Sequence, residues 1–583
     1  MEQVDVAIIG AGWHGIAAAK TYHAAYPSQK MVILDGASSV GGVWAKDRIY
    51  HGLKTNNVLG SYEFSDFPMS EEYFAVRQGQ HIPGDVVCAY FEASIKKFEL
   101  GDKLRLNCRV ESAEYASDHS WTLSIIEGSP QARRNFLKTS KLIVAAGLTS
   151  RPFMPQFAGV DDFRSDSQLL HFHDFVSHEA DILESETRVT VLGGSKSAWD
   201  VVYSCATRGL VVDWVIRESG NGPTWMAPAY VGWPFKRLLE SFPVTRLFSL
   251  FSPCAWNLEA GTLYTWLHSS WLGRKIVDAF WGMMQLSLEK ANGYREHSET
   301  QKLRPSVSPF WVATSLGILN YPTDFFDLVR KGKIRVHIAD IDRLSRRRVH
   351  LSNQEELDTD VLICCTGWEE MPGIRFLPED VSAKLGFPGN PDVIPRHLRE
   401  EVNQLIHYQF PKLRDQPPFT RGHAPDRRPL RLARFMVPVT MFQDRSIVLL
   451  GYTMSLNTTL LAEVQALWAA AFLNNEFLVV SPLTTMTIAD WMLETTKHTE
   501  FGRWRSPRAN GGHRYPNFVF DILPYLDLLL RDLGISPRRK AGFWAHWMQP
   551  HGINDYHGLV TEWRAAIRYT QEKQQTTNVA IFD

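Results

Sequence analysis

The chain contains two segments in which short apolar runs, typical of buried strands, flank a stretch whose apolar residues recur at helical spacing. The first begins with "VDVAIIGAG", continues into a helix over about His14–Ala25 and ends with "KMVILD" at Asp35. The second begins with "RVTVLGG", continues into a helix near Ser197–Arg208 and ends with "LVVDWVIR" at Arg217. Because strands that alternate with helices in this way form βαβ units, each segment predicts part of a parallel sheet.

Further strand-like runs follow each βαβ segment, and a mostly helical, Trp-rich stretch at about 225–294 is too long to be a loop. We therefore predict an α/β protein with two Rossmann-like dinucleotide-binding domains, the second inserted into a discontinuous first domain. The expected ranges are 1–160 and 340–475 for the first domain, 161–339 for the second domain with its helical insert, and 476–583 for a C-terminal helical extension.

Composition is that of an ordinary globular protein of several domains. Of 583 residues, 44% are hydrophobic and 21% are charged, and the 19 tryptophans are the one clear excess. That excess indicates a large apolar pocket or packed helical interfaces. The 62 Lys and Arg residues against 63 Asp and Glu leave a net charge of -1. A chain so balanced attracts no nucleic acid through its overall field, so we exclude a nucleic-acid partner.

The dinucleotide-type pattern starts within a few residues of Met1, which leaves no room for a signal sequence, so we expect a cytoplasmic protein. No run reaches the roughly 18 apolar residues of a transmembrane segment. The six cysteines form no CxxC pair and are expected to be reduced, and Cys364 and Cys365 lie in an apolar run typical of a buried strand. We expect no metal site, and the sequence leaves a homo-oligomer open.

The first turn has the residues that a dinucleotide site requires. Gly10, Gly12 and Gly15 stand at GxGxxG spacing between a strand and a helix. Such glycines permit a tight turn, expose backbone to a pyrophosphate and let the helix approach the strand, with the phosphates at the helix N-terminus. Asp35, at the end of the next strand, can accept the ribose hydroxyls. The glycines and the acid leave open which dinucleotide binds.

The second turn is a weaker match, because Gly193, Ser195 and Ala198 occupy the three glycine slots. Arg217 ends the following strand, where an NAD site would have an acid, and a guanidinium there can pair with a ribose 2'-phosphate. This favours NADPH, and a solvated charge at a strand end is the less favoured alternative for Arg217. Lys196 and Ser197 are further cofactor-binding candidates in the turn, and for Lys196 a structural role is the favoured alternative.

After Asp35, the run "GGVW" places Gly42 and Trp44 beside the first turn, and here the chain resembles the class B flavin monooxygenases up to about Leu473. This group contains flavin-containing, N-hydroxylating and Baeyer-Villiger monooxygenases. The resemblance implies that the first domain binds FAD, with Gly42 and Trp44 in the site, and that the second binds NADPH. Packing of Trp44 under the loop is an equally good alternative to a flavin contact.

The segment "LKTNNVLGSYEFSDFPM" resembles the TN...DFP segment of the same family. By that resemblance Asn56 is the catalytic amide near the flavin, because an amide can donate and accept without a charge to solvate. Turn formation is the alternative for Asn56, and we assign Asn57 to it. The run "GYTMSLNTT" resembles the family's closing strand and helix, which places Asn457 at the flavin pyrimidine, with ordinary N-capping as the alternative.

The family fingerprint FxGxxxHxxxF/Y is only half kept in "SDSQLLHFHDF". His171 aligns with the fingerprint histidine, which in the family organises the linker between the domains, but Ser165 and Ser167 occupy the Phe and Gly slots. His171 is therefore carried over as a cofactor-site residue by resemblance.

The resemblance implies an FAD- and NADPH-dependent monooxygenase that transfers one oxygen atom from O2 to an apolar small-molecule substrate through a C4a-(hydro)peroxyflavin. A role in specialised-metabolite biosynthesis is the accompanying hypothesis. Two alternatives stay open: a Baeyer-Villiger enzyme, which in the family uses an arginine beside the flavin that we cannot assign here, and a non-catalytic flavoprotein that senses NADPH.

Overall fold

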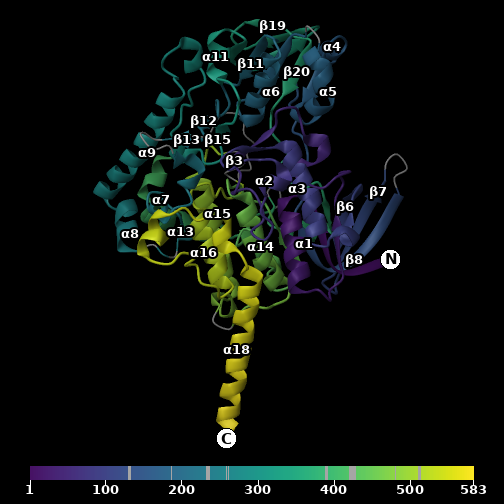
Figure 1. Ribbon diagram of the computed structural model, residues 1–583, viewed down its shortest axis with the longest axis vertical. Helices are drawn as coiled ribbons and strands as arrows, with labels where there is room; N and C mark the ends of the chain where they lie inside the picture. The colour runs from purple at the N-terminus through teal and green to yellow at the C-terminus, as the bar shows by residue number, and fades with distance from the viewer. Residues whose placement is uncertain are drawn as a thin grey trace.

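The two largest sheets of the protein, one mixed and one entirely parallel, lie beside a largely helical body (Figure 1). The computed structural model describes residues 1–128, 133–184, 187–231, 237–257, 259, 261–369, 371–387, 391–418, 428–478, 481–509 and 514–582. Five residues of the Trp-rich stretch, 232–236, and residues 258 and 260 therefore lie outside the described part of the chain. Of the described helices, none is long and apolar enough to cross a membrane.

The first sheet has the strand order of a dinucleotide-binding domain with an antiparallel extension. Its parallel part joins β24 (Ile447–Leu449), β8 (Arg133–Val144), β1 (Glu2–Ile9), β2 (Met31–Leu34) and β5 (Leu104–Arg105). The antiparallel part adds β7 (Trp121–Glu127) and β6 (Cys108–Tyr115), and β21 (Arg375–Leu377) pairs with β6. The helix α1 (Trp13–Ala25) follows β1 and lies against α14 (Thr458–Leu473). Residues from both ends of the chain thus build this domain.

The second sheet is entirely parallel, in the order β16 (Ile334–Ile338), β11 (Val212–Ile216), β10 (Val189–Leu192), β20 (Val361–Cys364) and β9 (Gln168–His171). The helices α5 (Phe172–Glu184) and α6 (Lys196–Thr207) connect its first strands. The small sheet of β17 (Ile341–Ser345), β18 (Arg348–Leu351) and β19 (Glu356–Asp358) shares an apolar cluster with it.

This topology differs from the expected return to the first domain at residue 340. The strand β20 is buried at all four positions and pairs with β10 and β9, so the second sheet receives strands until Cys364. An apolar run that is buried on both faces fits a parallel region of either sheet, so the sequence pattern does not indicate which sheet the strand joins. The chain crosses back to the first domain only at 365–369.

The Trp-rich stretch is helical over most of its described length but begins with a strand. β12 (Trp225–Pro228) pairs in parallel with β15 (Leu316–Leu319), and β13 (Tyr230–Val231) with β14 (Arg237–Leu238). The helices of the stretch are α7 (Arg246–Ser249), α8 (Thr262–Ser269) and α9 (Trp271–Ala291), and α10 (Ser298–Gln301) follows it. Trp256 and Trp281 are buried in the helical core, whereas the side chain of Trp271 is 68% exposed. Of the five described tryptophans of this stretch, Trp225, Trp256 and Trp281 are buried, whereas Trp266 and Trp271 are exposed.

The C-terminal extension is helical as expected, but it is not separate from the rest. Its helices are α15 (Ile488–Arg505), α16 (Ile522–Asp532), α17 (Phe543–Met548) and α18 (Leu559–Phe582). α16 packs on α14, and their apolar residues belong to one core cluster. Buried ion pairs add to this junction, since Nε of Arg434 lies 2.6 Å from Oδ2 of Asp532 on α16. Only α18 projects from the body, as Figure 1 shows at its lower edge.

The other described elements fill the space around the two sheets. In the first domain they are β3 (Lys54–Val58), β4 (His81–Pro83), α2 (Glu71–Phe74), α3 (Gly84–Lys97), α12 (Glu379–Lys384), α13 (Arg396–Gln409), β22 (Leu432–Ala433) and β23 (Val437–Pro438). In the second they are α4 (Val160–Arg164) and α11 (Phe325–Arg330). The six cysteines are free and buried, which agrees with the expected reduced thiols, and Cys364 ends the strand β20.

Candidate functional site: two glycine-rich turns and the cavity between the domains

The first glycine-rich turn has no space for side chains at its glycine positions. Gly10 has φ +106, and a Cβ there would lie 2.3 Å from the carbonyl oxygen of Ala145. A Cβ on Gly15 would lie 1.8 Å from the carbonyl oxygen of Gly10. Gly12 is the N-cap of α1, and the Cα of Gly12 would lie 3.2 Å from a Cβ on Gly42. The turn therefore presents bare backbone at a helix N-terminus, which fits a dinucleotide pyrophosphate.

Asp35 lies where the sequence placed it, directly after β2 and against the turn. Its carboxylate accepts hydrogen bonds from the backbone N–H of Ala11 at 2.7 Å and of Ala37 at 2.8 Å. Burial raises the pKa of Asp35, and the two backbone N–H groups oppose that shift. An acid fixed at this point is positioned to receive a ribose hydroxyl, which stays a prediction.

Trp44 follows the Gly41–Gly42 turn and is buried. Its indole N–H donates to the hydroxyl of Tyr62 at 3.0 Å, and the two rings meet edge to face. The polar atom of Trp44 is thus already satisfied by protein, which agrees with the packing alternative. A direct contact of the Trp44 ring with a flavin stays a prediction.

Asn56 lies in the strand β3, and not in a turn. It is half-buried, and its side-chain amide makes no hydrogen bond to any described residue, so both polar atoms are free to meet a ligand. The turn alternative for Asn56 is therefore wrong, and so is our assignment of Asn57 to a turn. The amide of Asn57 is buried and donates to Glu240 at 2.8 Å and to the carbonyl oxygen of Leu456 at 3.0 Å.

Asn457 occupies the N-cap of α14 but makes no side-chain capping hydrogen bond. Ordinary capping therefore does not explain this residue. The hydrogen bond from Asn57 to Leu456 ties β3 to the N-terminus of α14. Nearby, Gly451 has φ +76, and a Cβ there would lie 2.8 Å from Nδ1 of His14 on α1. Gly451, which the motifs did not single out, thus lets the closing loop approach the first glycine-rich turn.

The second glycine-rich turn has the same construction despite its weaker motif. Gly193 has φ +142, and a Cβ there would lie 2.4 Å from the carbonyl oxygen of Cys365. A Cβ on Gly194 would lie 2.5 Å from the carbonyl oxygen of Gly222. Ser195 is the N-cap of α6, but its side chain makes no capping hydrogen bond, so the hydroxyl is free to donate to an anion.

A cavity of about 440 Å³ opens at this turn and reaches the first domain. Its walls include Gly193 to Ser197 and Arg217 from the second domain, and Leu148, Thr149 and Met454 from the first. Three lining residues are cationic, namely Lys196, Arg217 and Arg508, and no Asp or Glu residue is among its described lining residues. Such a cavity fits a polyanionic ligand.

The cations of the cavity differ in how they are engaged. The guanidinium of Arg217 is exposed and makes no ion pair with any described residue. Lys196 is instead paired with Asp200 and donates to Oδ1 of Asn320 at 3.1 Å, in agreement with the structural alternative for that residue. Arg508 comes from the C-terminal extension, outside every motif, and donates to Oδ1 of Asn221 at 3.2 Å. Sequence patterns gave no signal for Arg508.

His171 lies at the junction of the two domains, where two crossing segments pair. Its Nδ1 accepts from the backbone N–H of His173 at 3.1 Å, so Nε2 carries the proton and donates to the carbonyl oxygen of Gly367 at 2.9 Å. Burial lowers the pKa of His171, which favours this neutral form. Phe153 donates to the same carbonyl oxygen at 3.1 Å. His171 thus contacts the interdomain linker, the place that the resemblance gave it.

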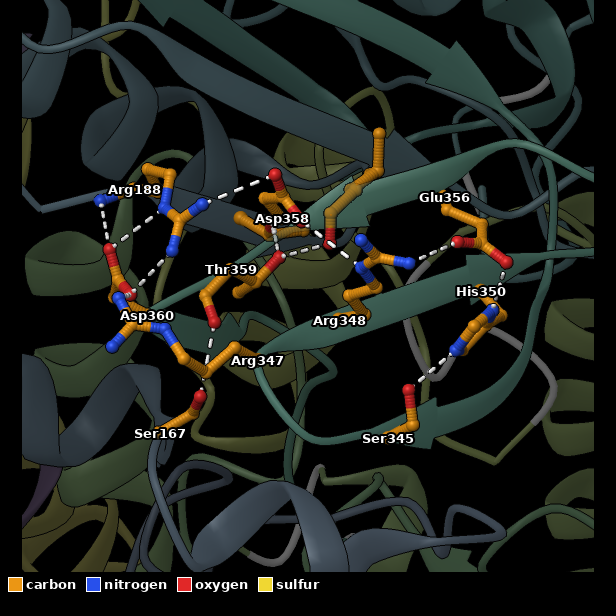
Figure 2. Close-up of polar contacts among 12 residues, drawn as sticks. Ser167, Arg188, Ser345, Arg347, Arg348, His350, Glu356, Asp358, Thr359 and Asp360 are labelled. Carbon is orange, nitrogen blue, oxygen red and sulfur yellow. Dashed lines mark hydrogen bonds and ion pairs between the residues drawn. The ribbon is translucent and has the colours of Figure 1, made fainter.

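Ser167, which occupies the position of the fingerprint glycine, makes a structural hydrogen bond. Its hydroxyl donates to the carbonyl oxygen of Thr359 at 3.1 Å, at the base of β20 (Figure 2). In the same figure Arg188 lies between Asp358 and Asp360 and pairs with both. Ser167 therefore ties the start of β9 to the segment between β19 and β20, and it is not among the described lining residues of the cavity.

The Trp-rich stretch and the C-terminal extension are the two regions that we expect to form a substrate cavity, and plain helical packing is the alternative for both. Of the Trp-rich stretch, Trp225 lines the cavity, and its indole N–H donates to the carbonyl oxygen of Val307 at 2.7 Å. The extension contributes Pro507, Arg508, Ala509 and Tyr515 to the wall. Both regions therefore reach the cavity, although through few residues each.

Comparison with known proteins gives concordant results. Residues 7–232 match the family described as pyridine nucleotide-disulphide oxidoreductase. The FAD-dependent monooxygenase rstn6 of Aspergillus nomiae is 32% identical over 590 residues, covering 96% of this chain and 98% of the relative. The FAD-dependent monooxygenase resA of Aspergillus sclerotiorum is 33% identical over 587 residues, with 96% of this chain and 98% of the relative covered.

Solved structures share the fold at low sequence identity. The closed crystal structure of cyclohexanone monooxygenase superposes with a TM-score of 0.57 at 16% identity, covering 97% of this chain and 98% of the other. Cyclohexanone monooxygenase from Rhodococcus sp. Phi1 bound to NADP+ gives 0.56 at 16% identity, with 91% and 97% covered. These structures support the arrangement of two dinucleotide-binding domains.

Proposed function

Because this chain belongs to the FAD-dependent monooxygenases, we propose that it uses FAD and NADPH to insert one oxygen atom from O2 into an apolar small molecule. The proposal includes a role in the biosynthesis of a specialised metabolite. When FAD is bound and has been reduced by NADPH, it supplies the chemistry that activates oxygen. The protein must hold both cofactors, orient them and exclude water.

One observation carries the proposal: a single cavity joins the second glycine-rich turn to Met454 and the linker segments of the first domain. A reductant bound at Ser195 and Arg217 would extend along this cavity toward the FAD domain. The bare backbone of Gly193 and Gly194 suits its pyrophosphate, and the exposed guanidinium of Arg217 suits a 2'-phosphate.

On the other side, the first turn and Asp35 suit the pyrophosphate and ribose of FAD. Asn56 has an amide free of protein partners on β3, and Asn57 ties that strand to the N-terminus of α14. The N-terminal amides of α14 can stabilise negative charge on a reduced flavin. In this arrangement Asn56 is the residue that would donate a hydrogen bond to the reacting oxygen.

The test is a product screen with labelled oxygen. Purified protein containing FAD is given NADPH, a panel of apolar small molecules and 18O2, and the products are analysed by mass spectrometry. One labelled oxygen atom in a product, with NADPH consumed in equal amount, supports the proposal. If FAD is not reduced by NADPH, or if no member of a broad panel acquires label while peroxide accounts for all the NADPH, the proposal fails.

Baeyer-Villiger oxidation is the second candidate, and Arg508 favours it. This guanidinium lines the cavity that Met454 also lines, and we propose it as the arginine that sequence motifs left unassigned. A fixed cation near the reacting atoms would stabilise negative charge that develops during attack on a ketone. Ketones in the labelled-oxygen panel separate the two candidates, since an ester or lactone product identifies this reaction.

A further inference from the structure

The strand that carries Asn56 is held by a side chain from the second half of the molecule. Asn320 directly follows β15 and is buried. Its Nδ2 donates to the carbonyl oxygen of Lys54 at 3.1 Å and to that of Thr55 at 3.2 Å. These carbonyls belong to the two residues before Asn56, so the amide of Asn320 fixes the backbone on which Asn56 stands.

The other end of the same amide faces the second glycine-rich turn. Oδ1 of Asn320 accepts a hydrogen bond from Nζ of Lys196 at 3.1 Å. Lys196 is the first residue of α6 and lines the cavity. One buried amide therefore connects a cation at the NADPH turn with the strand that carries the catalytic candidate.

Asp200 provides a second connection between the same two regions. One turn along α6, its carboxylate pairs with Lys196 and accepts from the hydroxyl of Tyr321 at 2.9 Å. Its Oδ2 accepts from the hydroxyl of Tyr50 at 2.9 Å, and Tyr50 lies a few residues before β3. Burial, together with the Asp200 charge, raises the pKa of Tyr50, so this hydroxyl stays protonated and keeps donating.

We propose that Asn320 is a positioning residue that transmits the state of Lys196 to β3 and so to Asn56. This inference rests on the proposed function, since it assigns NADPH to the turn at Lys196. A phosphate of NADPH at the N-terminus of α6 gives Lys196 a third acceptor beside Asp200 and Asn320, and the ammonium then divides its hydrogen bonds among the three. The presence of the nicotinamide cofactor thereby sets the placement of the Asn56 amide.

The variant Asn320→Asp tests the link without changing size. It keeps an acceptor for Lys196 and loses both N–H donors to the carbonyls of Lys54 and Thr55. FAD-containing enzyme is reduced with NADPH and mixed with oxygen in the absence of substrate. We expect hydrogen peroxide release to rise on the order of tenfold, because Asn56 is displaced. The Michaelis constant for NADPH should change by less than about twofold, and FAD content should not change.

The matched control is Asn292→Asp. Asn292 is also a buried asparagine, and its Nδ2 donates to the carbonyl oxygen of Met226 at 2.6 Å, away from β3. This variant should release peroxide at the wild-type rate. A second variant, Asn320→Gln, keeps both ends of the amide and should release less peroxide than Asn320→Asp.

Three outcomes would overturn the link while the function stands: wild-type peroxide release from Asn320→Asp, equal release from the Asn292→Asp control, or release from Asn320→Gln as fast as from Asn320→Asp. Failure of the proposed function has a different signature. In that case the wild-type protein itself does not oxidise NADPH through bound FAD.

Discussion

Nε2 of His171 donates to the carbonyl oxygen of Gly367 across 2.9 Å, and this bond fastens the sheet of one domain to the linker that leads into the other. The backbone N–H of Phe153, in the opposite crossing segment, donates to the same oxygen. One carbonyl group thus joins both crossings and the last residue of β9. The relative orientation of the two cofactor sites depends on this junction.

Replacing His171 should slow the transfer of hydride between the two sites. In His171→Ala the carbonyl of Gly367 loses one donor, and we expect FAD reduction by NADPH to slow on the order of tenfold, since small misplacements are costly in hydride transfer. His171→Gln restores a donor and should recover most of the rate. Stopped-flow absorbance of the flavin measures it, and equal rates in His171→Ala and wild type would contradict a role in orientation.

Arg217→Ala should separate the two nicotinamide cofactors. Loss of a charge-assisted pair with the 2'-phosphate costs about 2 kcal/mol, which corresponds to a roughly 30-fold increase in the Michaelis constant for NADPH. The constant for NADH should stay within about twofold of wild type, because NADH lacks that phosphate. Arg208→Ala, an exposed arginine directly after α6, is the control. Equal effects on both cofactors would remove the 2'-phosphate assignment.

Asn56→Ala should retain FAD and consume NADPH but yield hydrogen peroxide. The amide that would stabilise the reacting oxygen is lost, while the glycine-rich turns are untouched. Peroxide formed per NADPH consumed measures the effect, and FAD absorbance after gel filtration measures retention. Asn135→Ala, at an exposed strand position of the first domain, serves as the control. Complete coupling in Asn56→Ala would leave this residue without a catalytic role.

Asp532→Asn should destabilise the junction between the extension and the first domain. Arg434 and Asp532 are both buried, and Oδ2 of Asp532 also accepts from the indole N–H of Trp468 at 2.9 Å. Removing the charge of Asp532 leaves Arg434 with Glu494 as its remaining described ion-pair partner, at a cost of about 3 kcal/mol in the free energy of unfolding. The exposed pair Lys384–Asp380 provides the control, since Asp380→Asn should change it by at most about 1 kcal/mol. Urea unfolding followed by fluorescence measures both, and similar losses in the two variants would refute the prediction.

Buried histidines should make the protein less stable in acid. Burial lowers the pKa of His268 to about 3, and that of His498 to about 3, far below the value of an unfolded histidine. The contribution of the two neutral histidines to the free energy of unfolding is fully present above the pKa of an unfolded histidine. It is lost as the pH falls from there toward the lower pKa of the folded protein. Between pH 6.5 and 4, each should therefore remove about 1.4 kcal/mol per pH unit from the free energy of unfolding.

The variant His268→Gln isolates one of these groups. Its amide can still donate to the carbonyl oxygen of Leu250, which Nε2 of His268 reaches at 3.0 Å, but it does not titrate. Urea unfolding measured from pH 7 to pH 4 should show a flatter dependence in the variant. The same slope in both proteins would mean that the pKa of His268 does not differ between the folded and the unfolded protein.

Local patterns identified the two glycine-rich turns. Gly10 and Gly193 have positive φ, which only glycine adopts without strain. Each turn is preceded by a strand and followed by a helix, and the periodic patterns of both elements can be recognised over a few residues. Asp35 and Arg217 could be assigned because a strand end fixes which side of the sheet its next residue reaches. These features depend on neighbours in the chain, so one sequence is sufficient to predict them.

Tertiary structure decided what distant segments do for one another. The strand β20 is apolar on both faces and could have joined either sheet, and only its pairing with β10 and β9 assigns it to the second. Lys196 is engaged by Asn320, which lies 124 residues later, and Arg508 reaches the cavity from an extension without a recognisable motif. Periodicity carries no information on such contacts, because they arise when separately folded elements pack against each other. The sequence alone thus determined where the two glycine-rich turns lie, and the packing decided which side chains connect them.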